Sequence, residues 1–407
     1  MMYREIHKAE PCECPRSGWC ERHKIAKTAH WHMLCKTQPS YRQAWDEGWG
    51  PGQHMAVGTL CCRPARGKDE RIRVGLLTPT LMFGGAERWV AALATGLDKA
   101  RFDVVVGVRE RDATLASIQH SLHAANVTVV DGQWAFEWVA DRCDILIVWG
   151  LTALNMIAGY RRIVVMVSHG CCDWTLQCYQ KCRAEVTHLT AVSRHAAEVF
   201  MHHSVEVVHN GIDTPRCVVT VPREAVRSEW GLRSGELAIG FVGRFSADKN
   251  PLGVVHAVQQ LGAPYRAVMI GGGPYAAPFI AQSRKIMPST IIREPVDQVG
   301  NIYNALDCMI LTSPSEGFSL GLAEAWYCRC PTVATPVGAT EVQELHGALT
   351  VYVPIQHSAK QVADAIVVAM SDANRPVIER AARVVARHYT ADHMCRRWER
   401  YIDGLLA

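Results

Sequence analysis

Short runs of apolar, β-branched residues recur along most of the chain and are separated by polar or helical segments. In the first half the runs cover residues 73–78, 103–108, 127–130, 144–149 and 163–167. In the second half they cover residues 238–245, 267–274, 290–293 and 308–311. Strands that are apolar throughout indicate a parallel sheet covered on both faces. The pattern therefore predicts two α/β domains.

Breaks in this pattern divide the chain. Strand-like apolar runs begin at Ile72. Residues 214–235 combine prolines with many charges and contain no strand-like run. The last residues form a helical pattern rich in Arg and Trp. We therefore expect four parts, which cover residues 1–70, 71–222, 236–385 and 386–407.

Composition narrows the class of protein. A chain of 407 residues with 49% hydrophobic and 20% charged residues can build two ordinary cores and an extension. Its net charge of +4 is small for this length and argues against a general nucleic-acid binder. The first residues are charged and show no secretory signal, so sixteen cysteines favour a reduced, cytoplasmic setting.

The longest apolar stretch, residues 145–160, contains two glycines and an asparagine and is too short to span a membrane comfortably. We expect a soluble protein, with peripheral membrane contact as an open alternative.

Cysteines and histidines gather near the N-terminus. The candidate ligands are Cys12, Cys14, Cys20, His23, His30, His32 and Cys35. Spacings of one and two residues are typical of small metal sites, in which Cys and His saturate a tetrahedral ion and replace a hydrophobic core. We expect a structural zinc ion in preference to an iron–sulfur cluster. The alternative is an arm with a biased composition and no metal.

Three further features lie where ligands gather in parallel sheets, beyond the carboxyl ends of strands. Gly84-Gly85 follows the first strand and leads into a helical pattern, as in Rossmann-type domains. His169 follows the strand at 163–167, where a histidine serves a structural hydrogen bond as often as chemistry. Arg244 and Lys249 lie five residues apart on one loop, before an expected helix start at residues 248–251. Such a pair can hold a diphosphate from two sides.

Two carboxylates frame a loop that leads into a helix. Glu316 lies on the loop, Gly317 follows it, and Glu324 lies past the first turn of a helical pattern. The free N–H groups of a helix start attract phosphate, and carboxylates accept hydrogen bonds from hydroxyl groups. The arrangement fits a nucleotide sugar.

These residues also resemble a known family. Glu316 and Glu324, with Gly-Phe-Ser between them and Pro331–Thr335 after them, resemble the E-x7-E signature of family 4 glycosyltransferases, retaining enzymes of the GT-B fold. Gly-Gly-Ala-Glu at 84–87, Asn-Gly-Ile-Asp at 210–213 and Gly-Arg-Phe-x3-Lys-Asn at 243–250 follow the family's order. The stretch 335–342 resembles its Gly-Gly-x-x-Glu loop, with Ala339 in place of the second glycine. The resemblance covers about residues 71–407.

The resemblance implies two Rossmann-like domains facing a cleft, with the last helix crossing back to the first domain. It implies a hexosyltransferase-type enzyme (EC 2.4) that moves a sugar from a nucleoside diphosphate sugar to a hydroxyl of a glycan, a lipid or a small molecule, without a required cofactor. The implied catalytic residues are His169, Glu316, Arg244 and Lys249. The implied donor-binding residues are Gly84, Gly85, Arg244, Lys249, Gly317, Phe318, Ser319, Leu320 and Glu324. The base would lie near residues 290–296, and the Asn-Gly-Ile-Asp loop would shape the cleft.

Two alternatives stay open. The first is another nucleotide-sugar enzyme of this fold, such as an epimerase, which the E-x7-E pair and the Gly-Arg-Phe-x3-Lys motif disfavour. The second is a non-catalytic binding protein in which residues 1–70 act as a metal-stabilised adaptor on an inert scaffold. The presence of all the motif residues disfavours inertness.

Overall fold

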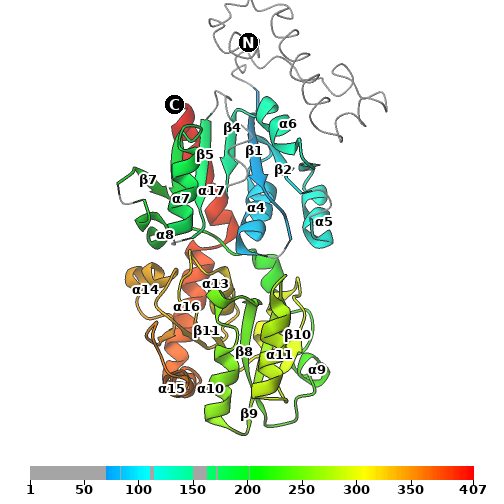
Figure 1. Cartoon of the computed structure of the whole chain (residues 1–407), viewed down its shortest axis with the longest axis vertical. Coiled ribbons are helices and arrows are strands. Elements are labelled where there is room, and N and C mark those ends of the chain that lie inside the picture. The colour runs from blue at the N-terminus through cyan, green and yellow to red at the C-terminus, as the bar shows by residue number, and fades with distance from the viewer. Residues whose placement is uncertain (1–69, 83, 111–113, 150–162, 171–172, 201) are drawn as a thin grey trace, which may run out of the picture.

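The computed structural model describes residues 70–407, except residues 83, 111–113, 150–162, 171–172 and 201. The candidate zinc ligands between Cys12 and Cys35, like nearly all of the expected extension over residues 1–70, lie outside the described residues. The rest forms two α/β domains, one above the other in Figure 1. Two parallel-sheet domains of this kind confirm the predicted fold class.

The first domain is built on a parallel sheet whose described strands have the order β3-β2-β1-β4-β5-β6-β7. The strands are β1 Ile72–Thr78, β2 Phe102–Val108, β3 Thr128–Asp131, β4 Ile145–Val148, β5 Ile163–Ser168, β6 His188–Ala191 and β7 Val205–Val207. The helices are α4 Gly85–Gly96, α5 Ala116–Ala124, α6 Ala135–Arg142, α7 Asp173–Cys182 and α8 Arg194–Glu198. In β1, neighbouring side chains that point to opposite faces, such as Leu76 and Leu77, are both fully buried. This explains why the strand has no polar alternation.

The second domain repeats this plan with the strand order β10-β9-β8-β11-β12-β13. The strands are β8 Leu237–Arg244, β9 Tyr265–Gly272, β10 Ile291–Arg293, β11 Cys308–Leu311, β12 Thr332–Ala334 and β13 Val351–Tyr352. The helices are α9 Arg223–Glu229, α10 Gly253–Leu261, α11 Ala276–Ile286, α12 Val299–Ala305, α13 Leu320–Tyr327, α14 Thr340–His346, α15 Ala359–Ala369 and α16 Arg375–His388. In each sheet the chain reverses its direction of growth after the third strand, which places a crevice at the carboxyl ends of the central strands.

One expected boundary was wrong. The helix predicted to start at residues 248–251 begins later, at Gly253. A single 3-10 turn, η3 Ala247–Lys249, ends at Asn250, which adopts the left-handed conformation with φ 48°. The Asn250 side chain donates to Thr312 Oγ1 at 3.0 Å, which stabilises this break. Lys249 therefore lies on a short turn that is held to the neighbouring strand end.

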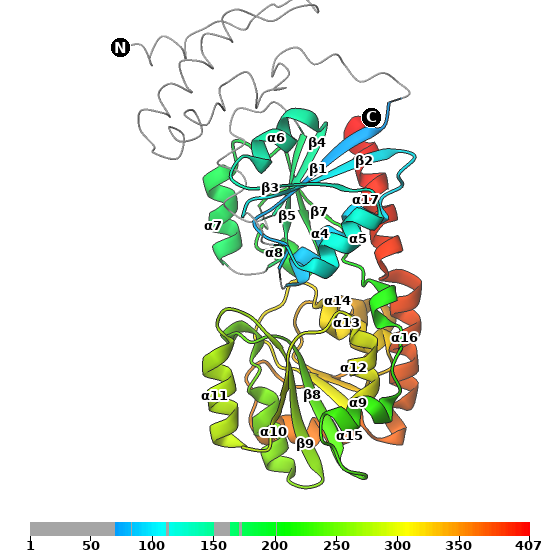
Figure 2. The same cartoon turned by 90° about the vertical axis from the view of Figure 1, so that its right-hand side faces the viewer.

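The chain crosses between the domains at two adjacent places. The first crossing follows the Asn-Gly-Ile-Asp loop, and the second joins α16 to α17 Ala391–Leu406. The two crossings are bonded to each other, because Ile212 N donates to Tyr389 O and Ala391 N donates to Ile212 O, both at 2.8 Å. Helix α17 then packs on the first domain, where Trp398 meets Trp89 with 5.8 Å between ring centroids (Figure 2). Across residues 70–407, outside the gaps named above, no helix has the length and apolar character needed to cross a bilayer.

Candidate active site

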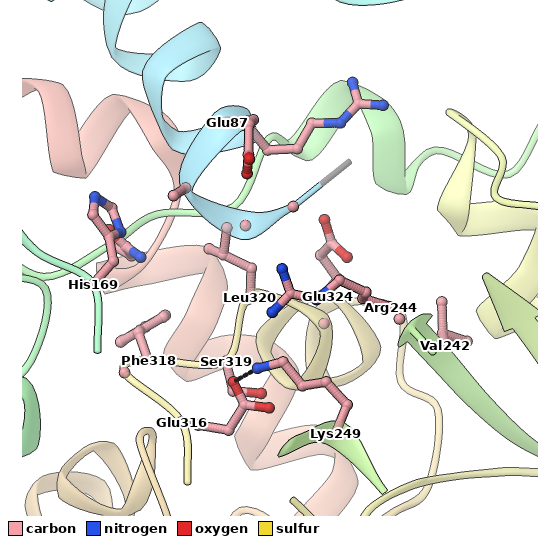
Figure 3. Close-up of a pocket in the computed structure, with 18 of the residues that line it drawn as sticks. Glu87, His169, Val242, Arg244, Lys249, Glu316, Phe318, Ser319, Leu320 and Glu324 are labelled. Atoms are coloured by element: carbon pink, nitrogen blue, oxygen red, sulfur yellow. Dashed lines mark hydrogen bonds and ion pairs between the residues drawn. The ribbon is translucent and has the colours of Figure 1, made fainter. Parts of the chain in front are cut away.

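A cavity of about 670 Å³ lies between the two domains, at the carboxyl ends of their central strands. The structure brings together in its wall every catalytic and donor-binding candidate expected from the sequence (Figure 3). These are Gly84, Gly85, His169, Arg244, Lys249, Glu316, Gly317, Phe318, Ser319, Leu320 and Glu324. Residues far apart in the sequence thus line one cavity.

Glu316 is held from several sides on the loop between β11 and α13. Lys249 Nζ lies 2.6 Å from Glu316 Oε2, and Ser313 Oγ donates to Glu316 Oε1 at 2.8 Å. Gly338 supports the loop from behind, since a Cβ there would lie 2.9 Å from Glu316 Cβ. Gly338 also has φ +60°, a conformation that favours glycine. The carboxylate is therefore buried and fixed in position.

The two cations expected to bind a diphosphate lie at the end of β8 and just after it: Arg244 is the last residue of the strand, and Lys249 lies on the turn η3 (Figure 3). Arg244 Nη2 lies 3.4 Å from Asp248 Oδ2, and the Arg244 side chain is 45% exposed. Lys249 is less exposed and pairs with Glu316. Burial would raise the pKa of Asp248, but a hydrogen bond from Ser246 and the charges of Lys249 and Arg244 bring it below its usual value. In this structure acidic neighbours thus balance both cations.

Glu324 lies in the second turn of α13, with its side chain 10% exposed. Arg216 Nη1 donates to Glu324 Oε1 at 2.9 Å, and Tyr303 OH lies 3.4 Å from Glu324 Oε2. Burial raises the pKa of Glu324, while the charges of Arg216 and Arg88 act in the opposite direction. Arg216 belongs to none of the motifs recognised in the sequence, and its place three residues after the Asn-Gly-Ile-Asp motif is the one local signal for it.

The N-terminus of α13 borders the same space. Ser319, at the N-cap, adopts the left-handed conformation with φ 69°, and its side chain makes no capping hydrogen bond. Leu320 and Gly321, which open the helix, line the cavity. The first N–H groups of the helix can therefore meet an anion.

The first domain contributes buried polar groups. His169 follows β5, and its ring meets Trp89 edge-on with 4.7 Å between centroids. Within the described residues, His169 Nε2 and Asn210 Oδ1 are buried without a hydrogen-bond partner, and both residues line the cavity. Burial lowers the pKa of His169 to about 3, so its ring is neutral at pH 7. Buried polar atoms without partners are costly, which is consistent with a ligand that supplies hydroxyl groups here.

Glu87 is a further residue that the sequence analysis did not assign. It lies in the first turn of α4, on the wall of the cavity that belongs to the first domain (Figure 3). Burial raises the pKa of Glu87, whereas a backbone hydrogen bond and the charge of Arg244 oppose this effect. Each domain thus presents acidic groups to the cavity.

The two domains are in direct contact around the cavity. Ser193 Oγ donates to Gly317 O, and Arg194 N donates to Glu341 Oε2 at 2.6 Å. His209 also contacts Glu341, and Arg88 of α4 pairs with Asp297 of the second domain. The structure is therefore a closed arrangement of the domains.

Among the described residues, no group of three or more His, Cys, Asp or Glu side chains could hold a metal ion. The groups that face the cavity are cations, carboxylates, helix N–H groups and two unpartnered polar atoms. This set can bind a ligand that combines a diphosphate with several hydroxyl groups.

Comparison with known proteins agrees with this geometry. Residues 236–372 match the family model described as glycosyl transferases group 1. A D-inositol 3-phosphate glycosyltransferase of Mycolicibacterium smegmatis is 29% identical over 242 residues, which cover 55% of this chain and 50% of that protein. The protein of the same name from Mycobacteroides abscessus is 32% identical over 174 residues, which cover 40% of this chain and 38% of that protein. The chain thus matches half or less of the length of these curated relatives.

Solved structures show the same architecture. Anabaena HepE in complex with UDP-glucose superposes with a TM-score of 0.71 at 16% identity, covering 82% of this chain and 100% of that chain. The sucrose-phosphate synthase of Thermosynechococcus elongatus superposes with a TM-score of 0.67 at 14% identity, covering 83% and 99%. The predicted GT-B fold is therefore confirmed, and within the second domain residues 236–372 match the glycosyl transferases group 1 model.

Proposed function

We propose that this protein is a retaining glycosyltransferase, which moves a sugar from a nucleoside diphosphate sugar to a hydroxyl group of an acceptor. One observation carries the proposal: Arg244, Lys249, Glu316 and Glu324 line a single cavity between the domains. The cavity's volume of about 670 Å³ suits a small-molecule site, since such pockets commonly measure roughly 300–1,000 Å³. An inert scaffold would not require this convergence.

In the proposed complex the diphosphate lies between Arg244, Lys249 and the first N–H groups of α13. The phosphate would pair with Arg244 and Lys249 in place of Asp248 and Glu316, which pair with them in this structure. Glu316 then accepts hydrogen bonds from hydroxyls of the transferred sugar, and Glu324 accepts those of the ribose.

The sugar would lie against the wall of the first domain. Neutral His169 Nε2 and Asn210 Oδ1, which have no partner among the described residues, are placed to bond a sugar hydroxyl. Their buried position gives such a bond more weight than one exposed to water. This wall would also help to select the sugar.

In the proposed reaction the bond between the anomeric carbon and the phosphate oxygen breaks. The acceptor oxygen attacks from the same face, which retains the configuration, and its proton passes to the departing phosphate. Arg244, Lys249 and the helix N–H groups stabilise the charge that develops on the leaving diphosphate. We propose that these fixed donors make a divalent cation unnecessary for transfer.

The choice of first substrates follows from the comparisons. Because HepE was solved with UDP and UDP-glucose, uridine diphosphate sugars are the first donors to test. Because the curated relatives are named for D-inositol 3-phosphate, phosphorylated polyols are the first small acceptors to test, beside glycans and lipids. Product mass then identifies the acceptor class.

Substitution of Glu316 tests the proposal. We expect Glu316→Ala and Glu316→Gln to lower transfer at least 100-fold, about 3 kcal/mol of lost transition-state stabilisation, with little change in thermal unfolding. The matched control is Glu344→Ala, on the exposed face of α14, which should transfer sugar like the wild type. Transfer at the wild-type rate by the Glu316 variants would overturn the assignment.

A further inference from the structure

Arg216 lies on the segment that joins the two domains and yet lines the cavity. It belongs to the short turn η2 Thr214–Cys217, which follows the Asn-Gly-Ile-Asp loop. Its side chain is 15% exposed. A guanidinium that is this well buried needs hydrogen-bond or ion-pair partners, and these partners indicate its role.

Arg216 connects two parts of the cavity wall. Its Nη1 donates to Glu324 Oε1 at 2.9 Å, and its Nε donates to the main-chain oxygen of Asp297 at 3.0 Å. Asp297 follows Pro295 and Val296, which line the cavity on the side of β10. The same guanidinium therefore fixes the carboxylate of α13 and the loop after β10.

The other oxygen of Glu324 is held weakly. Tyr303 OH lies 3.4 Å from Glu324 Oε2 but donates to Gly321 O at 3.0 Å. A phenol has one hydrogen to donate, so the shorter bond to Gly321 takes precedence. Arg216 therefore occupies one oxygen of Glu324 and leaves the other able to accept hydrogen bonds from a ligand.

Charge supports the same role. The titratable and charged groups that act on Glu324 are Arg216, Arg88, Asp213, Tyr303 and Cys217. Arg216 and Arg88 are the cations among these groups that favour the ionised carboxylate, and of the two only Arg216 forms an ion pair with it in the described part of the chain. Burial raises the pKa of Glu324, so loss of Arg216 would raise that pKa further.

We propose that Arg216 is a positioning residue that orients Glu324 to receive the ribose hydroxyls of the donor and so makes nucleotide binding depend on them. This inference rests on the proposed function, because it deepens the role of the same site. In this role the guanidinium does not bind the donor directly. It acts through the carboxylate and through the backbone of residue 297.

Calorimetric titration of the full chain with UDP and with 2′,3′-dideoxy-UDP tests the proposal. The wild type should bind UDP at least tenfold more tightly than the dideoxy compound. Arg216→Met should weaken UDP binding about tenfold, leave dideoxy-UDP binding nearly unchanged, and thereby remove the preference. Arg216→Lys should restore part of the preference, because it keeps the charge but not the paired donors. Arg383→Met, on the exposed face of α16, is the matched control and should bind like the wild type.

The pH dependence provides a second readout. In Arg216→Met, UDP affinity should fall more steeply than in the wild type between pH 8 and pH 5.5, because Glu324 takes up a proton at a higher pH. The titration of UDP itself cancels in the ratio of variant to wild type.

The outcomes separate the two proposals. If the wild type binds none of UDP, GDP and ADP, the proposed function and this inference both fail. If the wild type prefers UDP over its dideoxy form and Arg216→Met keeps that preference, the inference alone fails. If Arg216→Met loses affinity for UDP and for dideoxy-UDP to the same extent, Arg216 serves the structure of the linker. That result would also overturn the inference.

Discussion

At the scale of single residues, the wall of the first domain contains an unusual neutral histidine. His169 follows a strand whose residues are nearly all buried, and its ring contacts Trp89 and Trp149. Burial lowers the pKa of His169 to about 3, against an ordinary value near 6.5. A histidine that is neutral at pH 7 can hold a hydroxyl, but it is not a general acid at that pH.

This environment has a consequence for stability. Below pH 6.5 the histidine of the unfolded chain takes up a proton, while the folded one stays neutral until about pH 3. The unfolded state thus binds more protons in this window, so the free energy of unfolding falls as pH is lowered. The contribution of His169 to this slope of the free energy of unfolding approaches about 1.4 kcal/mol per pH unit.

Replacement by an uncharged residue isolates this effect. The free energy of unfolding of the wild type should fall more steeply between pH 6.5 and pH 4 than that of His169→Gln, as measured by urea denaturation. The carboxylates titrate in both proteins and so cancel in the comparison. Parallel curves would show that His169 is protonated in the folded protein.

Single residues also mark the limit of sequence reasoning at this site. Glu316, Glu324, Arg244 and Lys249 could be predicted because each lies in a motif of several residues at the junction of a strand or loop with a helix. Arg216 was not assigned, because it is one charged residue among many and acquires its role only through a partner distant in sequence. For Arg216 that partner, Glu324, lies 108 residues away.

At the scale of elements, the strand ends and the loops that follow them build the cavity. Apolar runs predicted the positions of β1, β2, β5, β8, β9 and β11, since buried strands carry a strong hydrophobic signal. The start of α10 was misplaced, because the left-handed turn at Asn250 depends on a tertiary bond to Thr312. The residues next to Asn250 in the sequence do not reveal such a bond, because its partner lies 62 residues away.

The loop between β11 and α13 approaches the first domain closely at Gly317. A Cβ on this residue would lie 2.2 Å from the main-chain oxygen of His169. Real Cβ atoms do not approach an oxygen so closely, so the loop or the whole domain would have to move. Glycine here is therefore a condition for closing the cavity.

Alanine at this position should hold the domains apart. We expect Gly317→Ala to lower transfer more than tenfold, to increase the radius of gyration in X-ray scattering, and to leave secondary structure unchanged. Gly404→Ala in α17 is the matched control, because a Cβ there meets nothing within 4 Å. This control should leave transfer intact. It should raise the free energy of unfolding by up to about 1 kcal/mol, because alanine favours the helix over glycine by this amount. A compact Gly317→Ala protein with full activity would contradict the steric argument.

At the scale of the whole molecule, the cavity needs both domains, since neither one alone supplies the cations and the unpartnered polar atoms. The architecture was predictable from the repeat of the α/β pattern, with a break at residues 214–235. The closed arrangement was not, because it depends on contacts such as that of Ser193 with Gly317.

The Cys/His-rich extension is the remaining prediction at this scale. We expect the purified full chain to contain about one zinc ion per molecule, because closely spaced Cys and His suit tetrahedral zinc. Elemental analysis of the full chain and of a chain that begins at residue 70 should show zinc only in the first. Equal metal content in the two proteins would remove the extension as the zinc site.

The bonded pair of crossings at Ile212 and Thr390 restricts how the molecule can open. A single linker would leave one domain free to twist and tilt about a point, whereas two linkers fastened side by side define an axis. Gly211 keeps them together, since a Cβ there would lie 2.1 Å from the oxygen of Thr390. We therefore expect opening to follow one angular coordinate, so that each return to the closed state brings the same atoms of the two walls face to face.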